Sequence, residues 1–262
     1  MTGNESDIVT FNYYQYYKAF AMSGIINYHE GPVSWINPKK GEKGPSLAFD
    51  VKLDEITAEK EIKAIITGIC AKNIPNLWIL TPDATPRNIV AILEKNGFRN
   101  LSSEASEPEL GMLLNRNDFE PYSSSEVRCR KVQSKKDFRL WIDVVNTALH
   151  GWEMIDAEHY YVWVEKENIN IYLGEINGIP VSTVATIQTK DVASIEFTST
   201  LQEYRCRGAA ATLCSKALAD LFTNDVKAVT LSGAPEAVAL YQKLGFHSCF
   251  HNILMRYDIP EK

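Results

Sequence analysis

A nine-residue pattern occurs twice in this chain and limits the folds that it can adopt. Residues 90–98 read VAILEKNGF, and residues 238–246 read VALYQKLGF. Each copy is a short apolar helix pattern that ends at a glycine, where a left-handed residue can cap the helix, and a strand pattern follows. An apolar strand and a turn with proline precede both copies. The repeat therefore predicts two related domains of similar build.

The polar segment 117–125 (NDFEPYSSS) has the composition of a linker between these domains. We therefore expect one domain over residues 1–120 and a second over residues 126–262. In the first, a helix is expected over 57–72, with apolar residues on one face.

The second half has the clearer order of elements. Asn177-Gly178, a strong hairpin signal, separates strand patterns at 169–176 and 179–189, and a third strand pattern covers 193–200. The remaining expected elements are a strand at 127–132, a helix at 134–149, a helix from Gly208, a strand at 228–232, a helix at 235–244 and a final strand pair. This order predicts a mixed α+β domain with a central, mostly antiparallel sheet flanked by helices.

A turn of small residues lies where the third strand passes into a helix. Gly208 and the alanines Ala209, Ala210 and Ala211 carry almost no side chain, so an anion could reach the free N–H groups of the helix start. Arg205 and Arg207 add positive charge on either side of Cys206. The turn predicts a pyrophosphate site, although both arginines could equally be solvated surface charges.

Composition excludes some classes of function. The net charge of −6 argues against sequence-independent binding of nucleic acid. The five cysteines form no CxxC pair, so we expect reduced thiols, no metal and a cytoplasmic protein. The N-terminus lacks the pattern of a signal peptide, and no apolar run approaches the ~20 residues of a membrane span.

The second half resembles the GNAT superfamily of N-acetyltransferases over residues 126 to 262. Arg205, Gly208 and Ala210 satisfy the turn of that family, and Leu240-Tyr241 and Gly245-Phe246 follow at the family's spacing. Many members have an asparagine where this chain has Ala234, which puts one contact in doubt. The resemblance implies acetyl-coenzyme A as co-substrate, with its pantetheine along Thr198, Ser199 and Thr200 and its pyrophosphate on residues 205–211.

Direct attack of an amine on a thioester needs a base, an acid and an oxyanion donor. The resemblance makes Tyr241 the candidate acid, although from its pattern alone it could be a packed aromatic residue. Glu196 is the candidate base, or else a solvated carboxylate. We expect Glu196 to point to the same face as Thr198, since two residues separate them in the strand.

The irregular segment 150–161 is the candidate acceptor region. Trp152 and Tyr160 offer aromatic faces and Glu153 offers negative charge, which weakly favours a cationic amine. An acidic helix with aromatic residues buried beneath it fits the same pattern.

The first half lacks the features of a cofactor site. Acidic residues, among them Asp54 and Glu55, precede its helix where the second half has small ones, and Leu93 stands where Tyr241 stands. We expect this half to be a degenerate GNAT-like domain that forms a wall of the acceptor cleft or a domain interface. Its aromatic run Phe11 to Phe20 could equally pack inside a helix interface.

The favoured prediction is an N-acetyltransferase of a small-molecule or amino-acid-like amine, acting as a monomer or homodimer. A sensor that binds acyl-coenzyme A without turnover is the alternative. A third reading, a two-lobed aminoacyl transferase, fits less well because those chains are longer and do not keep the pyrophosphate turn.

Overall fold

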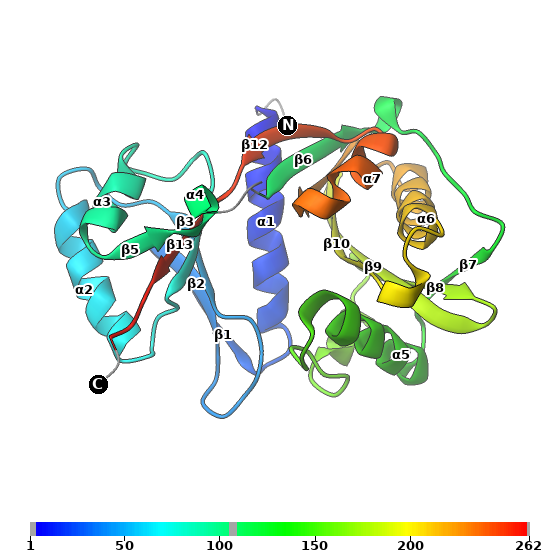
Figure 1. Ribbon diagram of the computed structural model, residues 1–262, viewed down its shortest axis with the longest axis horizontal. Coiled ribbons are helices and arrows are strands. Elements are labelled where there is room, and N and C mark those ends of the chain that lie inside the picture. The colour runs from blue at the N-terminus through cyan, green and yellow to red at the C-terminus, as the bar shows by residue number, and fades with distance from the viewer. Residues whose placement is uncertain (1–3, 105–108, 261–262) are drawn as a thin grey trace.

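A computed structural model describes residues 4–104 and 109–260 and shows two lobes on either side of a long helix, α1 (Glu5–Ala21) (Figure 1). Each lobe is built on a sheet that is antiparallel except for one parallel pair of strands. The expected fold class, tandem mixed α/β domains with mostly antiparallel sheets, is confirmed.

The first lobe holds a six-stranded sheet. Its strands are, in spatial order, β1 (Ile26–His29), β2 (Val33–Pro38), β3 (Leu47–Val51), β4 (Leu77–Leu80), β13 (Ile253–Tyr257) and β5 (Phe98–Asn100). Its helices are α2 (Ala58–Cys70), α3 (Ile89–Lys95) and the short α4 (Leu101–Glu104). Helix α2 buries Ala58, Ile62 and Ile69 on one face, as its apolar periodicity predicts.

The second lobe holds a seven-stranded sheet. Its strands are, in spatial order, β12 (His247–His251), β6 (Leu110–Asn115), β11 (Ala228–Gly233), β10 (Val192–Thr200), β9 (Ile179–Thr189), β8 (Ile169–Ile176) and β7 (Val127–Lys131). Its helices are α5 (Lys135–Val145), α6 (Ala209–Thr223) and α7 (Val238–Lys243). Single turns are η1 (Arg116–Asp118), η3 (Tyr160–Trp163), η4 (Gln202–Tyr204) and η5 (Pro235–Ala237), and η2 (Asn146–His150) is a π-helical turn.

Two expectations for this lobe are confirmed closely. Asn177 and Gly178 join β8 to β9, and both have positive φ (52° and 77°), as a tight hairpin turn of this kind requires. The expected helix over 134–149 is α5 followed by η2. Its start at Ser134 is capped, because the Ser134 side chain accepts a hydrogen bond from the Asp137 N–H.

The sequence repeat corresponds to a structural repeat. In the first lobe the chain runs β3, α2, β4, α3, β5, and in the second it runs β10, α6, β11, α7, β12. The corresponding strands occupy the same places in the two sheets. Gly97 and Gly245 both adopt positive φ after their helices, as the pattern predicted.

The two lobes exchange one strand each. Strand β6 comes from the first half but lies between β11 and β12 of the second sheet, and the C-terminal β13 lies between β4 and β5 of the first. The expected final strand pair is therefore wrong: β12 and β13 join different sheets. The expected domains, 1–120 and 126–262, are continuous stretches of the sequence. Each sheet, by contrast, includes one strand from the other stretch.

Helix α1 packs against both lobes. The Asn12 side-chain amide donates to the Ala193 carbonyl (3.0 Å) and to the Thr230 hydroxyl (2.9 Å), which ties α1 to β10 and β11. The Trp163 indole N–H donates to the Ala19 carbonyl (2.9 Å). Buried aromatic rings from α1 join the larger core of the molecule. None of the helices in the described ranges combines the length and apolar character needed to cross a membrane.

Candidate active site

Strands β10 and β11 separate inside the second sheet. They run parallel and pair from Val192 with Ala228 to Ser194 with Thr230, and no pairing continues beyond this point in the described structure. The pairing of β10 with β9 also shifts between Glu196 and Ser199, and Phe197 adopts a positive φ of 52°. A bulge of this kind bends a strand and re-aims its side chains. The bend opens a gap between two neighbouring strands.

The bulge corrects the expectation that Glu196 and Thr198 share a face. Glu196 lies on the face of Ser194, whose partner Thr230 is bonded to α1. Because Phe197 is left-handed, its ring lies on the α1 side as well, 5.5 Å from the Tyr16 ring. Thr198 then turns to the other face, where its hydroxyl lies 3.7 Å from the Cys214 sulfur of α6. The two side chains therefore lie on opposite faces of the gap.

Glu196 is a buried carboxyl group that has one oxygen without a hydrogen-bond partner among the described residues. Its side chain is 9% exposed, and its Oε1 atom is buried without a hydrogen bond among the described residues. Burial raises the pKa of Glu196 to about 8, because ionisation inside the protein is unfavourable. A carboxyl group with a pKa near the working pH is suited to accept a proton in catalysis.

Tyr241 lies on the α6 side of the gap. It comes from the first turns of α7, is 5% exposed, and belongs to the same hydrophobic core as Cys214. Burial raises the pKa of Tyr241 above the ordinary tyrosine value, against a smaller opposing effect of the Thr198 hydroxyl. Its hydroxyl is therefore protonated at neutral pH.

The turn before α6 leaves backbone donors free. Gly208 caps the helix with φ of 78°, and Cys206 also has positive φ. Between residues 206 and 211, no backbone N–H has a backbone acceptor within the described part of the chain. Ala209 and Ala211 are buried and Ala210 is half-buried, so small side chains surround these N–H groups. Such a helix start can bind an anion.

Gly208 also meets a packing requirement. A Cβ atom there would lie 2.8 Å from the Tyr122 hydroxyl oxygen. Tyr122 belongs to the segment 117–125, which packs along α6 because the Tyr122 N–H donates to the Ser215 hydroxyl (2.9 Å) and the Ser124 N–H to the Thr212 hydroxyl (3.0 Å).

The two arginines of the turn are both exposed but differ in their contacts. The Arg205 Nε donates to the Thr200 carbonyl (3.2 Å), which fixes the end of β10 against the turn. Arg207 is held by the Glu126 carboxylate, 2.8 Å from its Nη2. Arg205 thus keeps its terminal nitrogens available, whereas Arg207 could bind an anion only in competition with Glu126.

Ser199 and Thr200 stabilise the bulge. The Thr183 hydroxyl donates to the Phe197 carbonyl (2.7 Å) and lies 2.6 Å from the Ser199 hydroxyl. The Ser182 hydroxyl donates to the Ser199 carbonyl (2.7 Å) and lies 3.0 Å from that of Thr200. These bonds hold the strand in its bent form, which a regular ladder would straighten.

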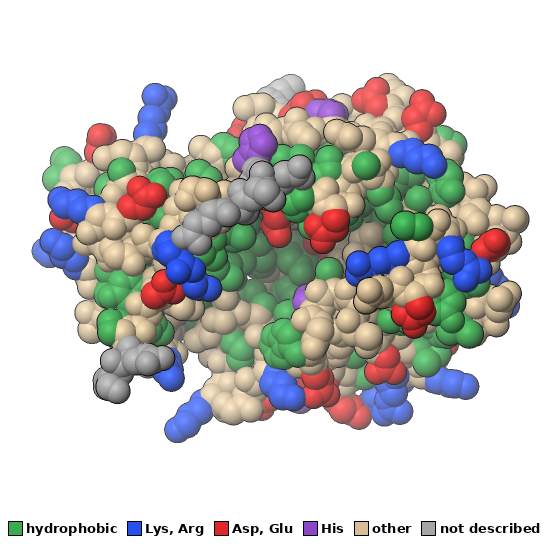
Figure 2. All heavy atoms as spheres, viewed as in Figure 1, with side chains coloured by type: hydrophobic (Ala, Val, Ile, Leu, Met, Phe, Trp, Pro, Cys, Tyr) green, Lys and Arg blue, Asp and Glu red, His purple; other side chains and the backbone are tan. Residues whose placement is uncertain are grey.

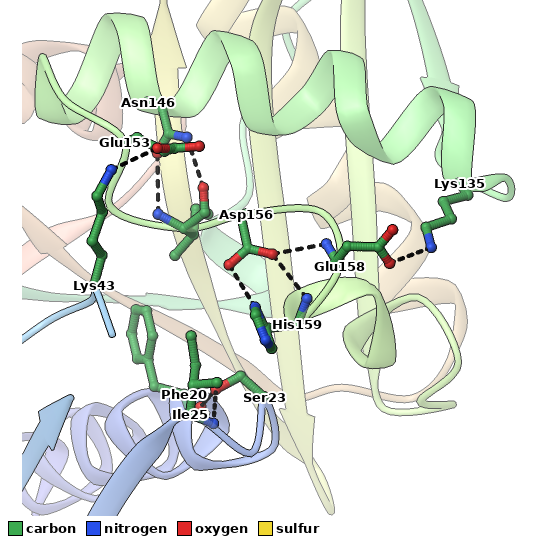
Figure 3. A network of polar contacts seen from close by, with 11 residues as sticks. Phe20, Ser23, Ile25, Lys43, Lys135, Asn146, Glu153, Asp156, Glu158 and His159 are labelled. Atoms are coloured by element: carbon green, nitrogen blue, oxygen red, sulfur yellow. Dashed lines mark hydrogen bonds and ion pairs between the residues drawn. The ribbon is translucent and has the colours of Figure 1, made fainter. Parts of the chain in front are cut away.

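The candidate acceptor segment is a tied loop (Figure 3). The Asn146 side chain, on the π-helical turn, bonds to the backbone of Met154 and Ile155, and the Asp156 carboxylate accepts from the N–H groups of Glu158 and His159. These contacts fix the path of the loop beside α5.

The three acceptor candidates of this loop do not come together. Trp152 is 49% exposed, and Glu153 lies at the surface in an ion pair with Lys43 (2.7 Å). Tyr160 is fully buried, with its ring 4.8 Å from that of Trp163 and 6.0 Å from that of Phe20. Tyr160 thus fits the alternative expectation of a buried aromatic residue, whereas Trp152 is accessible to solvent.

Two groupings of polar residues were not predicted from the sequence. Near the gap, the Ser232 hydroxyl donates to the Glu109 carboxylate (3.1 Å), and the Asn252 amide donates to the Tyr13 hydroxyl (2.9 Å). Away from it, Glu5 and His247 are bonded at the surface beside Cys249. The residues of each grouping come from distant parts of the sequence and meet only in the folded chain. No local sequence signal could therefore have shown them.

Comparisons with known proteins agree with this geometry. The sequence profile of the acetyltransferase (GNAT) family matches residues 127–246. No curated protein sequence is significantly similar to the chain.

Solved structures extend the likeness to the whole chain. A GCN5-related N-acetyltransferase from Kribbella flavida is 15% identical, with a TM-score of 0.72 over 98% of this chain and 96% of its own. One from Sphaerobacter thermophilus is also 15% identical, with a TM-score of 0.63 over 87% of this chain and 81% of its own. A tandem GNAT protein from the clavulanic acid biosynthesis pathway is 12% identical, with a TM-score of 0.62 over 99% of this chain and 97% of its own. Residues 127–246 therefore belong to the acetyltransferase (GNAT) family, within a chain that has the tandem GNAT fold throughout.

Proposed function

We propose that this protein is an N-acetyltransferase that moves an acetyl group from acetyl-coenzyme A to the amine of a small acceptor. The observation that carries the proposal is the gap where β10 separates from β11. Free backbone donors and Tyr241 lie on one side of this gap, and Glu196, with its Oε1 atom unpaired among the described residues, lies on the other. Family membership supports acyl transfer from an acyl-coenzyme A, and the acetyl group and the amine are the finer parts of the proposal.

The residues of the turn suit the pyrophosphate of coenzyme A. The N–H groups of residues 206–211 would donate to its oxygens, with the helix dipole of α6 favouring the negative charge. Arg205 would add directed donors, and the edge of β10 at Thr198 to Thr200 would run beside the pantetheine arm. When bound, the cofactor supplies a thioester whose carbonyl carbon accepts an amine.

Ionised Glu196 takes a proton from the acceptor ammonium, directly or through a water molecule, and leaves a neutral amine. The amine nitrogen forms a bond to the carbonyl carbon, and the carbon–sulfur bond breaks. Tyr241 donates its proton to the departing sulfur, and the nitrogen loses its second proton to solvent. A backbone N–H near Thr198 is the candidate oxyanion donor.

The first lobe is proposed to bind no coenzyme A. At the start of α2, the Asp54 carboxylate accepts from the N–H groups of Ile56 (2.9 Å) and Thr57 (3.3 Å), and the Asp54 carbonyl accepts from Ala58 (2.8 Å). The Asp54 carboxylate and carbonyl thus occupy N–H groups at a helix start that the second lobe leaves free. The proposal includes a cytoplasmic monomer or homodimer, and the five free cysteines favour a reducing compartment.

Release of free thiol from acetyl-coenzyme A in the presence of a panel of small amines tests the proposal. We expect release that depends on the amine and stops in a Glu196→Gln, Tyr241→Phe double variant. Cofactor binding by calorimetry without thiol release from any amine would instead support a sensor that binds acyl-coenzyme A without turnover.

A further inference from the structure

A hollow lies between the two lobes. Figure 2 shows it at the centre of the molecule, with hydrophobic side chains on its walls and acidic side chains at its rim. Figure 1, drawn from the same side, shows α1 passing through the middle of the molecule at this place.

Tyrosines of α1 lie between the two lobes, because the Tyr17 ring is 4.6 Å from that of Phe49 in β3 and the Tyr16 ring contacts β10. Tyr13, Tyr16 and Tyr17 are three and four residues apart, which places them on one side of the helix. Tyr16 and Tyr17 are half-buried, so solvent reaches them. The Tyr16 ring lies 5.5 Å from Phe197 and 5.3 Å from Tyr17. Together these rings form an aromatic wall next to the bulge of β10.

Two carboxylates accompany this wall. Burial raises the pKa of Tyr16 well above its ordinary value, and the negative charges of Glu196 and Glu109 raise it further. The same two carboxylates act on Tyr13 and Tyr17, after burial. The hydrogen bonds give the placement: Glu109 accepts from Ser232, two residues beyond Thr230 of β11, and Glu196 lies two residues beyond Ser194 of β10. Both carboxyl groups are therefore on the α1 face, on either side of the gap between β10 and β11.

Strand exchange places Glu109 there. Glu109 precedes β6, and Asn252 lies between β12 and β13, so each belongs to a segment that crosses from one lobe to the other. The two segments run side by side, because the Asn252 N–H donates to the Glu109 carbonyl (3.0 Å). The Asn252 amide also reaches Tyr13 and, at 3.4 Å, Ser232 of β11. Glu109 and Asn252 thus lie side by side next to β11 and Tyr13.

In the part of the chain that the structure describes, neither Glu196 nor Glu109 forms an ion pair with a lysine or an arginine. The Glu196 Oε1 atom is buried without a partner there, and the Glu109 carboxylate accepts from Ser232. A buried carboxylate without a partner is unfavourable until a donor arrives. Aromatic faces beside it favour a cation that carries an apolar body.

We infer that this hollow takes a primary ammonium on an apolar or aromatic body that has no carboxylate of its own. Glu109 holds the ammonium on entry, Tyr16 and Phe197 flank the body, and Glu196 takes the proton. An α-amino acid is disfavoured, because its carboxylate would lie beside Glu109 and Glu196, with which no lysine or arginine of the described residues pairs. This inference rests on the proposed function and names its substrate class.

Pairs of compounds that differ only in the carboxylate test the inference. We would compare 2-phenylethylamine with phenylalanine, and isoamylamine with leucine, by thiol release from acetyl-coenzyme A. Each amine should have a kcat/KM on the order of 10²-fold higher than its amino acid, because like charges at close range are strongly unfavourable. Equal or better use of the amino acids would overturn the inference and leave the proposed function intact.

Variants identify the residues responsible. Glu109→Gln keeps an acceptor for Ser232 but removes the charge, and should raise the KM for the amines about tenfold with kcat unchanged within about twofold. It should also narrow the preference for amines over amino acids. Glu55→Gln, an exposed change in the first lobe, is the matched control. An unchanged KM in Glu109→Gln would contradict the assigned role of Glu109.

A binding measurement keeps the inference separate from turnover. If no compound releases thiol, the proposed function fails, and calorimetry with the same four compounds then decides the inference. Amine binding that weakens in Glu109→Gln and in Tyr16→Leu, but persists in Tyr16→Phe, supports it. Absence of any preference for the amines overturns it.

Discussion

The two lobes have the same strand order, yet only one keeps an open gap at its parallel pair. In the second lobe, β10 bends at Phe197 (φ 52°) and leaves β11. In the first, β3 has a left-handed residue at the corresponding place, Asp50 (φ 50°), and pairs with β4 only through Ala48 and Trp78. Both lobes therefore have the bend that produces a gap.

The first lobe closes its gap with its own chain. The segment after β4 folds back on the end of β3, because the Thr85 N–H donates to the Val51 carbonyl (2.9 Å) and the Leu53 N–H to the Thr85 carbonyl (3.1 Å). The Tyr14 hydroxyl of α1 also bonds to Thr81 there (3.0 Å). The same bend in a strand thus borders a candidate cofactor cleft in the second lobe and a closed surface in the first. The difference is that the segment at Thr85 fills the gap only in the first lobe.

The largest expected effect comes from making the α6 turn resemble its counterpart at α2. Ala210→Glu places a carboxylate at the first turn of α6, where it suits the helix dipole but repels a pyrophosphate. We expect affinity for coenzyme A to fall by on the order of 10²-fold or more, with folding retained. Ala219→Glu, on the exposed side of the same helix, is the control. Equal affinity of both variants would place the cofactor elsewhere.

A second difference between the lobes is Tyr241, which corresponds to Leu93. Tyr241→Phe should lower kcat by on the order of 10²-fold if the hydroxyl is the general acid, with little change in cofactor affinity. Steady-state kinetics and calorimetry measure the two quantities. Tyr257→Phe in the first lobe is the control, and unchanged turnover in Tyr241→Phe would make Tyr241 a packing residue.

The buried Glu196 predicts opposite effects of pH on rate and on stability. Because the base must be ionised and its pKa is raised to about 8, kcat/KM should rise with pH through about 8, and Glu196→Gln should lose this rise. Above the unfolded carboxyl pKa, the folded state still binds this proton, so the free energy of unfolding should fall as pH rises toward 8. The slope is up to about 1.4 kcal/mol per pH unit.

Denaturant unfolding of the wild type and of Glu196→Gln measures the difference in slope. The measurements should run from about pH 5 to about pH 9, which includes the Glu196 pKa of about 8. Parallel curves for the two proteins would show that Glu196 ionises normally.

The smallest effect belongs to the sealed lobe. Asp54→Ala removes the acceptor for two N–H groups at the start of α2, and should lower Tm by about 2–4 °C. Affinity for coenzyme A should not change, and no second site should appear, because the gap stays closed by Thr85. A change in cofactor affinity, measured by calorimetry, would contradict the separation of the two lobes.

Local patterns predicted most of the second lobe. The strands at 169–176, 179–189 and about 193–200 were predicted nearly to the residue, because Asn177-Gly178 fixes the hairpin and apolar alternation fixes the rest. The repeat at 90–98 and 238–246 predicted two related domains, because the same local pattern forms the same helix and strand in each. Whether the turn at 205–211 binds pyrophosphate stays a prediction.

Two features could not be predicted, since each depends on contacts between distant segments. The pattern at 253–257 indicates a strand but not its partner, so its place beside β4 was missed. No residue near Phe197 in the sequence indicates a left-handed conformation at this position. The expectation that Glu196 and Thr198 share one face of the strand was therefore wrong. The same exchange of strands brings Glu109 to the gap and so escapes any local signal.

The stoichiometry of coenzyme A binding tests the central contrast most directly. Titration calorimetry of the whole chain should find one site per chain, and that site should be lost in Ala210→Glu and kept in Asp54→Ala. Two sites per chain, or one site that survives Ala210→Glu, would contradict the account in which only the second lobe holds the cofactor.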